Sequence, residues 1–174
     1  MVEFIDNVDE KDYVIGRATR KNTHTSGKWH RGVNVILLNQ QEKLFLPMRS
    51  STKDKFPSTY DCSVSEHVIS GESYDQAAIR GLSEELNIQN IKLKKLIKFR
   101  GSFGKNDNMI SVLFVGRHDG IITMDKNEVA NGSFFELSKL KKMLNDNELE
   151  FAPWASKLLK RYLNMPSDFI EMAI

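Results

Sequence analysis

The segment of the chain that decides the fold is residues 65–88, SEHVISGESYDQAAIRGLSEELNI. Between residues 75 and 86 its apolar side chains recur at helical spacing, which predicts an amphipathic helix. Gly71 and Glu72 predict a tight turn before this helix, and Asn87 predicts its C-terminal end. The apolar stripe expected to face the core consists of Ala78, Ile79, Leu82 and Leu86.

Charged side chains occupy fixed positions along the same segment. Arg80 and Glu84 are separated by one helical turn and share a face, while Glu85 lies one step around the helix. Carboxylates that lie close together raise one another's pKa unless a cation neutralises them. Oxygen ligands of this kind suit Mg²⁺ or Mn²⁺, which bridge phosphate oxygens and activate water. The plain alternative is a surface helix with solvated charges.

The segment resembles the Nudix box, in which a glycine, a glutamate, an Arg-Glu pair, a Glu-Glu pair and a final glycine stand at fixed spacing. The positions that match in register are Glu72, Arg80, Leu82, Glu84, Glu85 and Ile88. Three positions depart from the box: Glu66 replaces the first glycine, Gly81 replaces the glutamate after the arginine, and Asn87 replaces the last glycine. Gly81 removes a metal ligand of the family and costs about 1 kcal/mol relative to alanine inside a helix.

A narrower resemblance covers residues 13–137, which are similar to the Nudix branch closest to type I isopentenyl-diphosphate isomerase. The pieces that match are VIGRATR, KWHRGVNVILLN, FLPMRSSTKDKFPSTYD and DKNEVANGSFFEL. The resemblance implies that His30 and His67 bind a divalent metal ion and that Arg49 and Lys53 contact a substrate diphosphate. His24 lies close to a third metal-binding histidine of that branch, with a difference of one residue in length.

The residues that carry the isomerase reaction do not match. That reaction needs a cysteine and a glutamate on opposite faces of an allylic carbon, and this chain has Ser65 and Met109 at those positions, with Asp107 as the metal-binding companion. Cys62 lies three residues before Ser65, an odd offset that would point it to the other face of a strand. A methionine cannot transfer a proton, so the isomerase is the less favoured alternative.

The resemblance therefore implies a Nudix-type pyrophosphohydrolase that uses Mg²⁺ or Mn²⁺ to cleave a nucleoside diphosphate, or another diphosphate linked to a further moiety. In this reading Glu72, Glu84 and Glu85 hold the metal and Arg80 orients the carboxylates. Glu85 or Glu128 deprotonates the attacking water. The plain interpretation of Glu128 is a solvated carboxylate in a turn.

Two alternatives stay open at this point. Because Gly81 removes a ligand, the protein could bind a nucleotide or diphosphate as a sensor without cleaving it. His30 and His67 could be structural, and Arg49 and Lys53 could belong to a solvated basic loop.

The order of expected elements predicts an α+β fold. Strands are expected at residues 13–15, 33–38, 43–47, 93–103 and 109–116, and further helices follow residues 137 and 152. Residues 1–10 are expected to form a loose or edge-pairing lead-in, 17–28 a polar stretch and 49–61 a loop. The resemblance implies a Nudix-like α/β/α sandwich, a mixed sheet with the box helix and a C-terminal helix packed on it.

Composition limits the class of protein. The chain has 174 residues, of which 40% are hydrophobic and 28% charged, as expected for one globular domain spanning residues 1–174. A formal net charge of +2 and the lack of a long apolar run argue against a nucleic acid polymer or a membrane as partner. The single cysteine and an N-terminus without signal-peptide character favour the cytoplasm. A small-molecule diphosphate is the expected partner, and a homodimer is one option for the oligomeric state.

Overall fold

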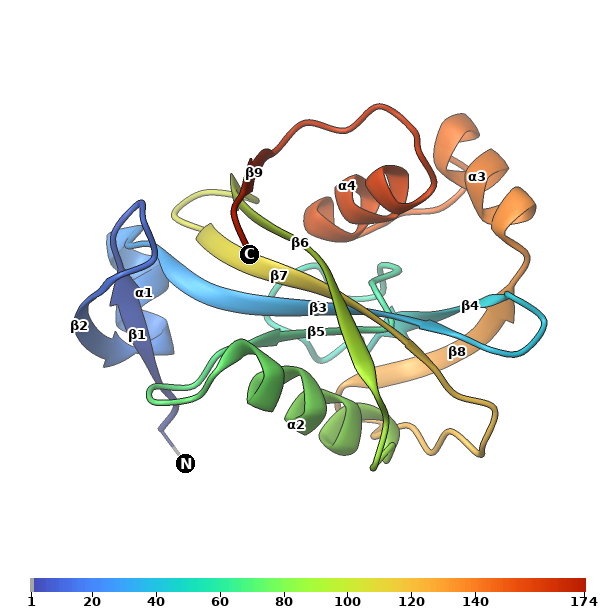
Figure 1. Ribbon diagram of the computed structural model, residues 1–174, viewed down its shortest axis with the longest axis horizontal. Helices are drawn as coiled ribbons and strands as arrows, with labels where there is room; N and C mark the ends of the chain where they lie inside the picture. The colour runs from blue at the N-terminus through green and yellow to red at the C-terminus, as the bar shows by residue number, and fades with distance from the viewer. Residues whose placement is uncertain (1) are drawn as a thin grey trace.

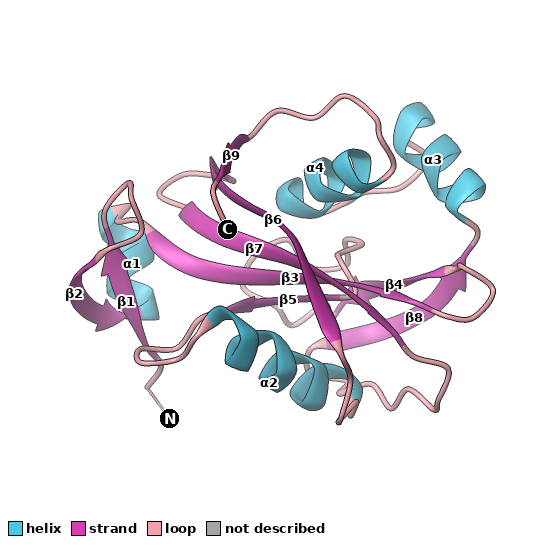
Figure 2. Ribbon diagram, in the orientation of Figure 1, coloured by secondary structure: helices cyan, strands magenta, loops and turns pink. Residues whose placement is uncertain are grey.

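The computed structural model describes residues 2–174, in which nine strands form one mixed sheet with four helices (Figures 1 and 2). The strands of this part of the chain are β1 (Phe4–Val8), β2 (Val14–Thr19), β3 (His30–Leu38), β4 (Leu44–Arg49), β5 (Val64–His67), β6 (Leu93–Ser102), β7 (Asn108–Arg117), β8 (Val129–Phe135) and β9 (Ile170–Met172). Its helices are α1 (Arg20–Ser26), α2 (Tyr74–Leu86), α3 (Leu137–Asp146) and α4 (Pro153–Tyr162).

The central strand β3 organises the sheet. One edge of β3 pairs in parallel with β7 along its whole length. Three short antiparallel strands follow one another along the other edge: β1 pairs at His30, β5 at residues 32–35 and β4 at Leu38. The two strands expected at residues 33–38 and 43–47 are present as β3 and β4, and the pairing of Leu38 with Leu44 joins them as a hairpin. Side chains from β1, β3 and β5 are therefore brought together at one end of β3.

Helices cover both faces of the sheet, as Figures 1 and 2 show. On one face, Ala78 and Leu82 of α2 pack in a buried cluster with Val33 and Val35. On the other face, residues of α3 and α4 pack with Ile36 and its neighbours. Successive residues of β3 face opposite layers because side chains alternate along a strand. The α/β/α arrangement and the mixed sheet are as predicted.

Local interactions fix both ends of α2. Ser73 caps the N-terminus, since its hydroxyl accepts from the Gln76 backbone and the Gln76 side chain accepts from the Ser73 backbone. Asn87 ends the helix in the left-handed conformation with φ 54°, as predicted. The predicted stripe is wrong at Ile79, which is 38% exposed. Glu85 is instead among the buried residues of this helix, together with Gly81.

The N-terminal region is more ordered than predicted. Residues 4–8 form β1, which lies between β2 and β3 in the sheet, whereas Met1 of the predicted lead-in lies outside the described residues. The polar stretch 17–28 contains the helix α1, which Thr19 caps and which ends at Gly27 with φ 66°. A helix of only seven residues shows no apolar stripe, so periodicity could not reveal it.

Three further strands, β5, β8 and β9, have no counterpart in the predicted elements. β5 is only four residues long and three of its residues are polar, and β8 contains Asn131 and Gly132, which favour turns. Both become strands because their backbones pair with β3 and β4 respectively. Pairing with neighbours that are distant in sequence therefore overrides weak local preference.

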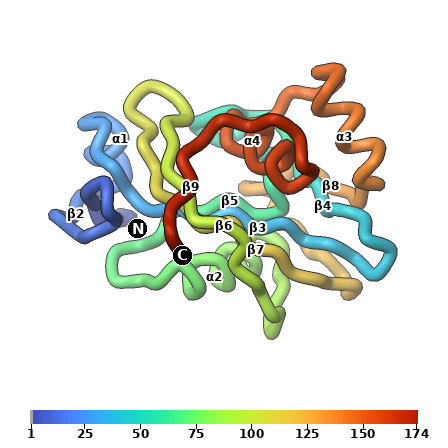
Figure 3. Tube along the Cα trace, turned by 45° about the horizontal axis from the view of Figure 1, so that its top comes forward, coloured from blue at the N-terminus to red at the C-terminus, as the bar shows by residue number. Residues whose placement is uncertain are grey.

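The C-terminal part of the chain completes the helical layer on the second face of the sheet. The predicted last helix is present as α4, with Pro153 in its first turn and Trp154, Leu158 and Leu159 buried. Figure 3 shows the chain after α4 crossing the sheet, where β9 pairs with β6. Within residues 2–174, no helix has the length and apolar character needed to span a bilayer.

Candidate active site

A cavity of about 480 Å³ lies beside the end of β3 where β5 and α1 meet the loop 49–61. Of the residues predicted for the site, the structure places Arg49, Lys53, His67 and Glu128 in its wall. The other predicted residues, Glu72, Arg80, Glu84, Glu85 and His30, are not among the residues that line it. The residues that line the cavity and were given no role in the predicted site include Glu66 and Trp154, and Asp107, the metal-binding companion named for the isomerase-like branch, lines it as well.

Arg80 forms hydrogen bonds with three carboxylates, those of Glu66, Glu72 and Glu84. Its Nε donates to Oε1 of Glu72 at 2.9 Å, and its Nη1 donates to Oε2 of Glu84 at 2.9 Å. Nη1 also reaches Oε2 of Glu66 at 3.3 Å, and Nη2 donates to the His67 carbonyl at 2.8 Å. One guanidinium thus joins the turn before α2, the helix itself and the end of β5. This geometry agrees with the orienting role predicted for Arg80, which stays a prediction.

Glu72 anchors the turn that enters α2. Its Oε2 accepts from the Ile69 backbone at 3.0 Å while Oε1 accepts from Arg80. Both oxygens are therefore engaged within the protein. Glu84 lies further out, with a side chain 58% exposed.

Glu85 differs from the other box carboxylates because it is buried, with a relative exposure of 7%. Burial raises the pKa of its carboxyl well above the ordinary value, and the charges of Glu66, Asp61 and Glu128 raise it further. Within residues 2–174 its carboxylate has no hydrogen-bond donor and no ion-pair partner. A buried carboxylate among other carboxylates is costly unless a cation neutralises it. A hard divalent cation is one group that would neutralise it.

Glu128 and Lys53 form an ion pair at the cavity wall. The backbone holds the two loops that carry them together, since the Ser50 N–H donates to the Glu128 carbonyl at 2.9 Å. The side chain of Lys53 is 23% exposed and that of Glu128 is 33% exposed, so both are accessible to a ligand. The acidic Glu128 and the basic Lys53 thus line the same cavity.

Arg49 is held more tightly than the sequence suggested. Its Nη1 donates to Asp61 at 2.7 Å, and its other nitrogens donate to the carbonyls of Lys55 and Phe56. The Trp154 ring lies 5.4 Å from the guanidinium carbon. Arg49 therefore braces the loop 49–61, and its predicted contact with a phosphate stays a prediction.

Asp61 is a buried carboxylate that was not predicted as part of the site. Its Oδ1 accepts from the hydroxyl of Ser65 and from Nε1 of Trp154, each at 2.7 Å. Ser65 also accepts from Nδ2 of Asn34 at 2.9 Å. No periodic or motif signal marks Asp61, because its partners come from three separate elements. Cys62 lies next to it in the core, where burial raises the pKa of its thiol well above the ordinary value.

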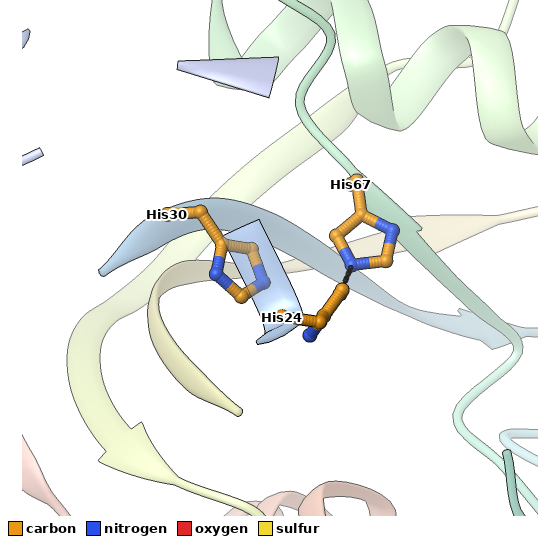
Figure 4. Close-up of side chains that lie close together, drawn as sticks. All are labelled: His24, His30 and His67. Atoms are coloured by element: carbon orange, nitrogen blue, oxygen red, sulfur yellow. Dashed lines mark hydrogen bonds between the residues drawn. The ribbon is translucent and has the colours of Figure 1, made fainter. Parts of the chain in front are cut away.

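Three histidines meet at the end of the cavity formed by α1, β3 and β5 (Figure 4). One ring nitrogen from each of His24, His30 and His67 lies within 4.8 Å of the others, and the Nε2 atoms of His24 and His67 are 3.1 Å apart. Asp107 adjoins them, with Oδ1 3.4 Å from Nδ1 of His24 and 3.8 Å from Nε2 of His30. That Nε2 atom of His30 and that Oδ1 atom of Asp107 are buried without a hydrogen-bond partner in residues 2–174.

The histidines are poised to be neutral at pH 7. Burial lowers the pKa of His30 to about 4, and the neighbouring His24 adds to this effect. Burial also lowers the pKa values of His67 and His24 below the ordinary value. A neutral imidazole keeps the lone pair that a metal ion requires. The orphaned ring nitrogen of His30 and oxygen of Asp107 fit a cation between them.

Comparisons with known proteins bear on the family and the fold of the chain. The family model for the NUDIX domain matches residues 28–161. An uncharacterized Nudix hydrolase of Streptomyces coelicolor is 35% identical over 152 residues, which cover 87% of this chain and 83% of that protein. An isopentenyl-diphosphate Delta-isomerase of Photorhabdus laumondii is 28% identical over 163 residues, which cover 91% of this chain and 92% of that protein.

A solved structure confirms the fold. The crystal structure of a Deinococcus radiodurans protein is similar with a TM-score of 0.79 at 28% sequence identity, covering 91% of this chain and 98% of the other. The predicted resemblance to the Nudix superfamily, including its isomerase-like branch, is thus borne out by both sequence and structure. The chain belongs to the Nudix family and is an enzyme of the Nudix hydrolase type.

Proposed function

We propose that the protein is a Mg²⁺- or Mn²⁺-dependent pyrophosphohydrolase that cleaves a nucleoside diphosphate, or another diphosphate linked to a further moiety. The observation that carries the proposal is the buried Glu85 carboxylate, which has no ion-pair partner in residues 2–174 and whose pKa is raised by burial and by the charges of Glu66, Asp61 and Glu128. Clustered carboxylates beside a lysine suit a substrate that arrives as a metal-bound diphosphate.

The remaining roles follow from the contacts. A divalent ion held by Glu72, Glu84 and Glu85 would supply charge neutralisation on the diphosphate and a lower pKa for the attacking water. Arg80 fixes the orientation of Glu72 and Glu84 through its hydrogen bonds.

Lys53 and Glu128 have complementary roles. Lys53 binds a phosphate oxygen of the substrate, and in doing so it leaves its ion pair with Glu128. The released Glu128 accepts the proton of the attacking water, with Glu85 as the other candidate base. Arg49 is a second contact for the phosphates once its bonds to the carbonyls of the loop rearrange.

The histidine cluster supports a second candidate function, the isomerase. His24, His30 and His67 would bind the ion that this branch uses. Against it, Ser65 and Met109 line the cavity, and neither is a thiol or a carboxylate that could move a proton across an allylic carbon. Hydrolysis therefore remains the primary proposal. Incubation with isopentenyl diphosphate, followed by detection of the migrated double bond, would support the isomerase instead.

The hydrolase proposal is tested with the variant Glu84→Gln/Glu85→Gln. Parent and variant are assayed for phosphate release from a panel of nucleoside diphosphate derivatives with Mn²⁺ or Mg²⁺. The expected result is loss of at least about a hundredfold in rate for the variant, with no loss for Glu150→Gln, an exposed acid outside the cavity. Parental activity in the double variant would refute the proposed roles of the box carboxylates. Ligand binding without turnover by the parent would favour a sensor.

A further inference from the structure

The two main departures from the box, Glu66 and Gly81, lie against each other in the structure. Glu66 is on β5 and Gly81 is inside α2, and these two elements pack together. The family pattern has a glycine on the strand and a glutamate on the helix, whereas this chain has the reverse. The two departures from the box therefore lie on the two sides of one contact between β5 and α2.

Gly81 has no room for a side chain. A Cβ atom there would lie 2.7 Å from Cγ1 of Val64 and 2.9 Å from Cγ of Glu66. Both distances are far below the normal separation of carbon atoms, which is about 3.5–4.0 Å. The glutamate side chain on the strand thus passes over the place where a side chain on the helix would begin. Glycine at this helix position is explained by that close approach, in spite of its cost to helix stability.

The carboxylate of Glu66 ends among the groups of the candidate site. Its Oε2 accepts from Nη1 of Arg80 at 3.3 Å, and this is its one hydrogen bond within residues 2–174. Glu66 lines the cavity with a side chain 21% exposed. Lys53 lines the same cavity, and the charge of Glu66 raises the pKa of the buried Glu85 carboxyl.

We propose that Glu66 supplies, from the strand, the metal-binding carboxylate that the helix lacks at Gly81. A ligand would thereby be moved from one element to another while its carboxylate stays in the same cluster. The neighbouring Glu85, nine-tenths buried and without a partner in the described chain, points independently to a cation at this place. The inference rests on the proposed metal-dependent function and adds a ligand to it.

The test is a set of exchanges between the two positions. Glu66→Gly, Gly81→Glu and the double variant Glu66→Gly/Gly81→Glu are compared with the parent for Mn²⁺ binding by calorimetry and for melting temperature without metal. Glu66→Gly is expected to weaken Mn²⁺ binding by about tenfold or more, because one charged ligand is lost. Gly81→Glu alone is expected to melt at a lower temperature without tighter binding, because its side chain collides with both Val64 and Glu66.

The double variant gives the decisive comparison. It is expected to recover Mn²⁺ affinity to within about threefold of the parent, because the carboxylate returns from the helix side into the space that Glu66 has left. Its melting temperature is expected to stay below that of the parent, because the new Cβ still lies against Val64. Should Gly81→Glu fail to fold, Glu66→Gln still removes the charge while it keeps the shape of the side chain. The same loss of about tenfold is expected for that variant.

The outcomes separate this inference from the proposed function. If Glu66→Gln binds Mn²⁺ as the parent does while Glu85→Gln binds it weakly, Glu66 is no ligand and the metal-dependent function stands. If both variants bind as the parent does, the inference and the proposed box site fail together. Glu150→Gln serves as the matched control, since it removes one exposed carboxylate outside the cavity.

Discussion

At the scale of single residues, Arg80 carries the largest number of contacts in the site. It donates to three carboxylates and one carbonyl through a fork of three nitrogens. Lysine keeps the charge but cannot reproduce this fork. The geometry of the carboxylates therefore depends on the guanidinium itself.

We predict that Arg80→Lys lowers kcat by about a hundredfold, because small misplacements of catalytic groups have effects of this size. The measurement is steady-state hydrolysis of the best diphosphate substrate at saturating Mn²⁺. Arg17→Lys, an exposed arginine outside the cavity, is the control and should match the parent. Equal kcat in Arg80→Lys and the parent would show that the fork has no such role.

His30 gives a prediction on pH and stability in metal-free protein. Its pKa of about 4 in the folded state is below the ordinary value of 6.5, so between these values the unfolded chain binds the additional proton. This contribution to stability is fully present above about pH 6.5 and is lost as the pH falls toward 4. Removal of the group should therefore flatten the dependence of stability on pH.

In the parent, the free energy of unfolding is expected to fall when the pH is lowered from 7 to 5. In His30→Gln we expect this fall to be smaller by about 2 kcal/mol. Urea unfolding at both pH values, with chelator present, measures the difference. His118→Gln, which is outside the histidine cluster, should retain the parental loss. An unchanged loss in His30→Gln would contradict the assigned burial effect.

At the scale of elements, α2 was predictable because local signals agree along its length. Its apolar spacing, the following Asn87 and the preceding turn are all readable from neighbouring residues. β5 and β8 were not predictable, because their strand conformation comes from pairing with distant segments. The contact of Glu66 with Gly81 was not predictable either, because it exists only where β5 packs on α2.

The end of α2 offers a test of the local signal. Asn87 has φ 54°, a conformation that costs about 1–2 kcal/mol for a residue with an ordinary side chain. Asn87→Ala should therefore lower the free energy of unfolding by about 1 kcal/mol, whereas Asn87→Gly should be at least as stable as the parent. Urea unfolding of the two variants compares them directly, and equal stability would show that the cap conformation is not what selects asparagine.

At the scale of the whole molecule, the layered fold and the resemblance to Nudix proteins were predictable, and the arrangement of the site was predictable only in part. The box positions specified Glu72, Arg80, Glu84 and Glu85, and the structure brings Arg80 to Glu72 and Glu84. The meeting of α1, β3 and β5 at the histidine cluster depends on α1 and β5, which the sequence pattern did not reveal. Substrate choice depends on the loops around the cavity, where local sequence carries little structural information.

The fold also explains the near-neutral composition. The acidic Glu66 and Glu128 line one cavity together with the basic Arg49, Lys53 and Lys55, so opposite charges that cancel in the total lie around the same space. Such a site is suited to a substrate that brings both negative phosphates and a divalent cation.

The most direct measurement is phosphate release from a panel of nucleoside diphosphate derivatives by chelator-treated protein, before and after Mn²⁺ or Mg²⁺ is added back. Metal-dependent hydrolysis predicts negligible release without the ion, and a rate that rises with ion concentration to a plateau for at least one substrate. Release at the same rate with and without chelator would contradict it.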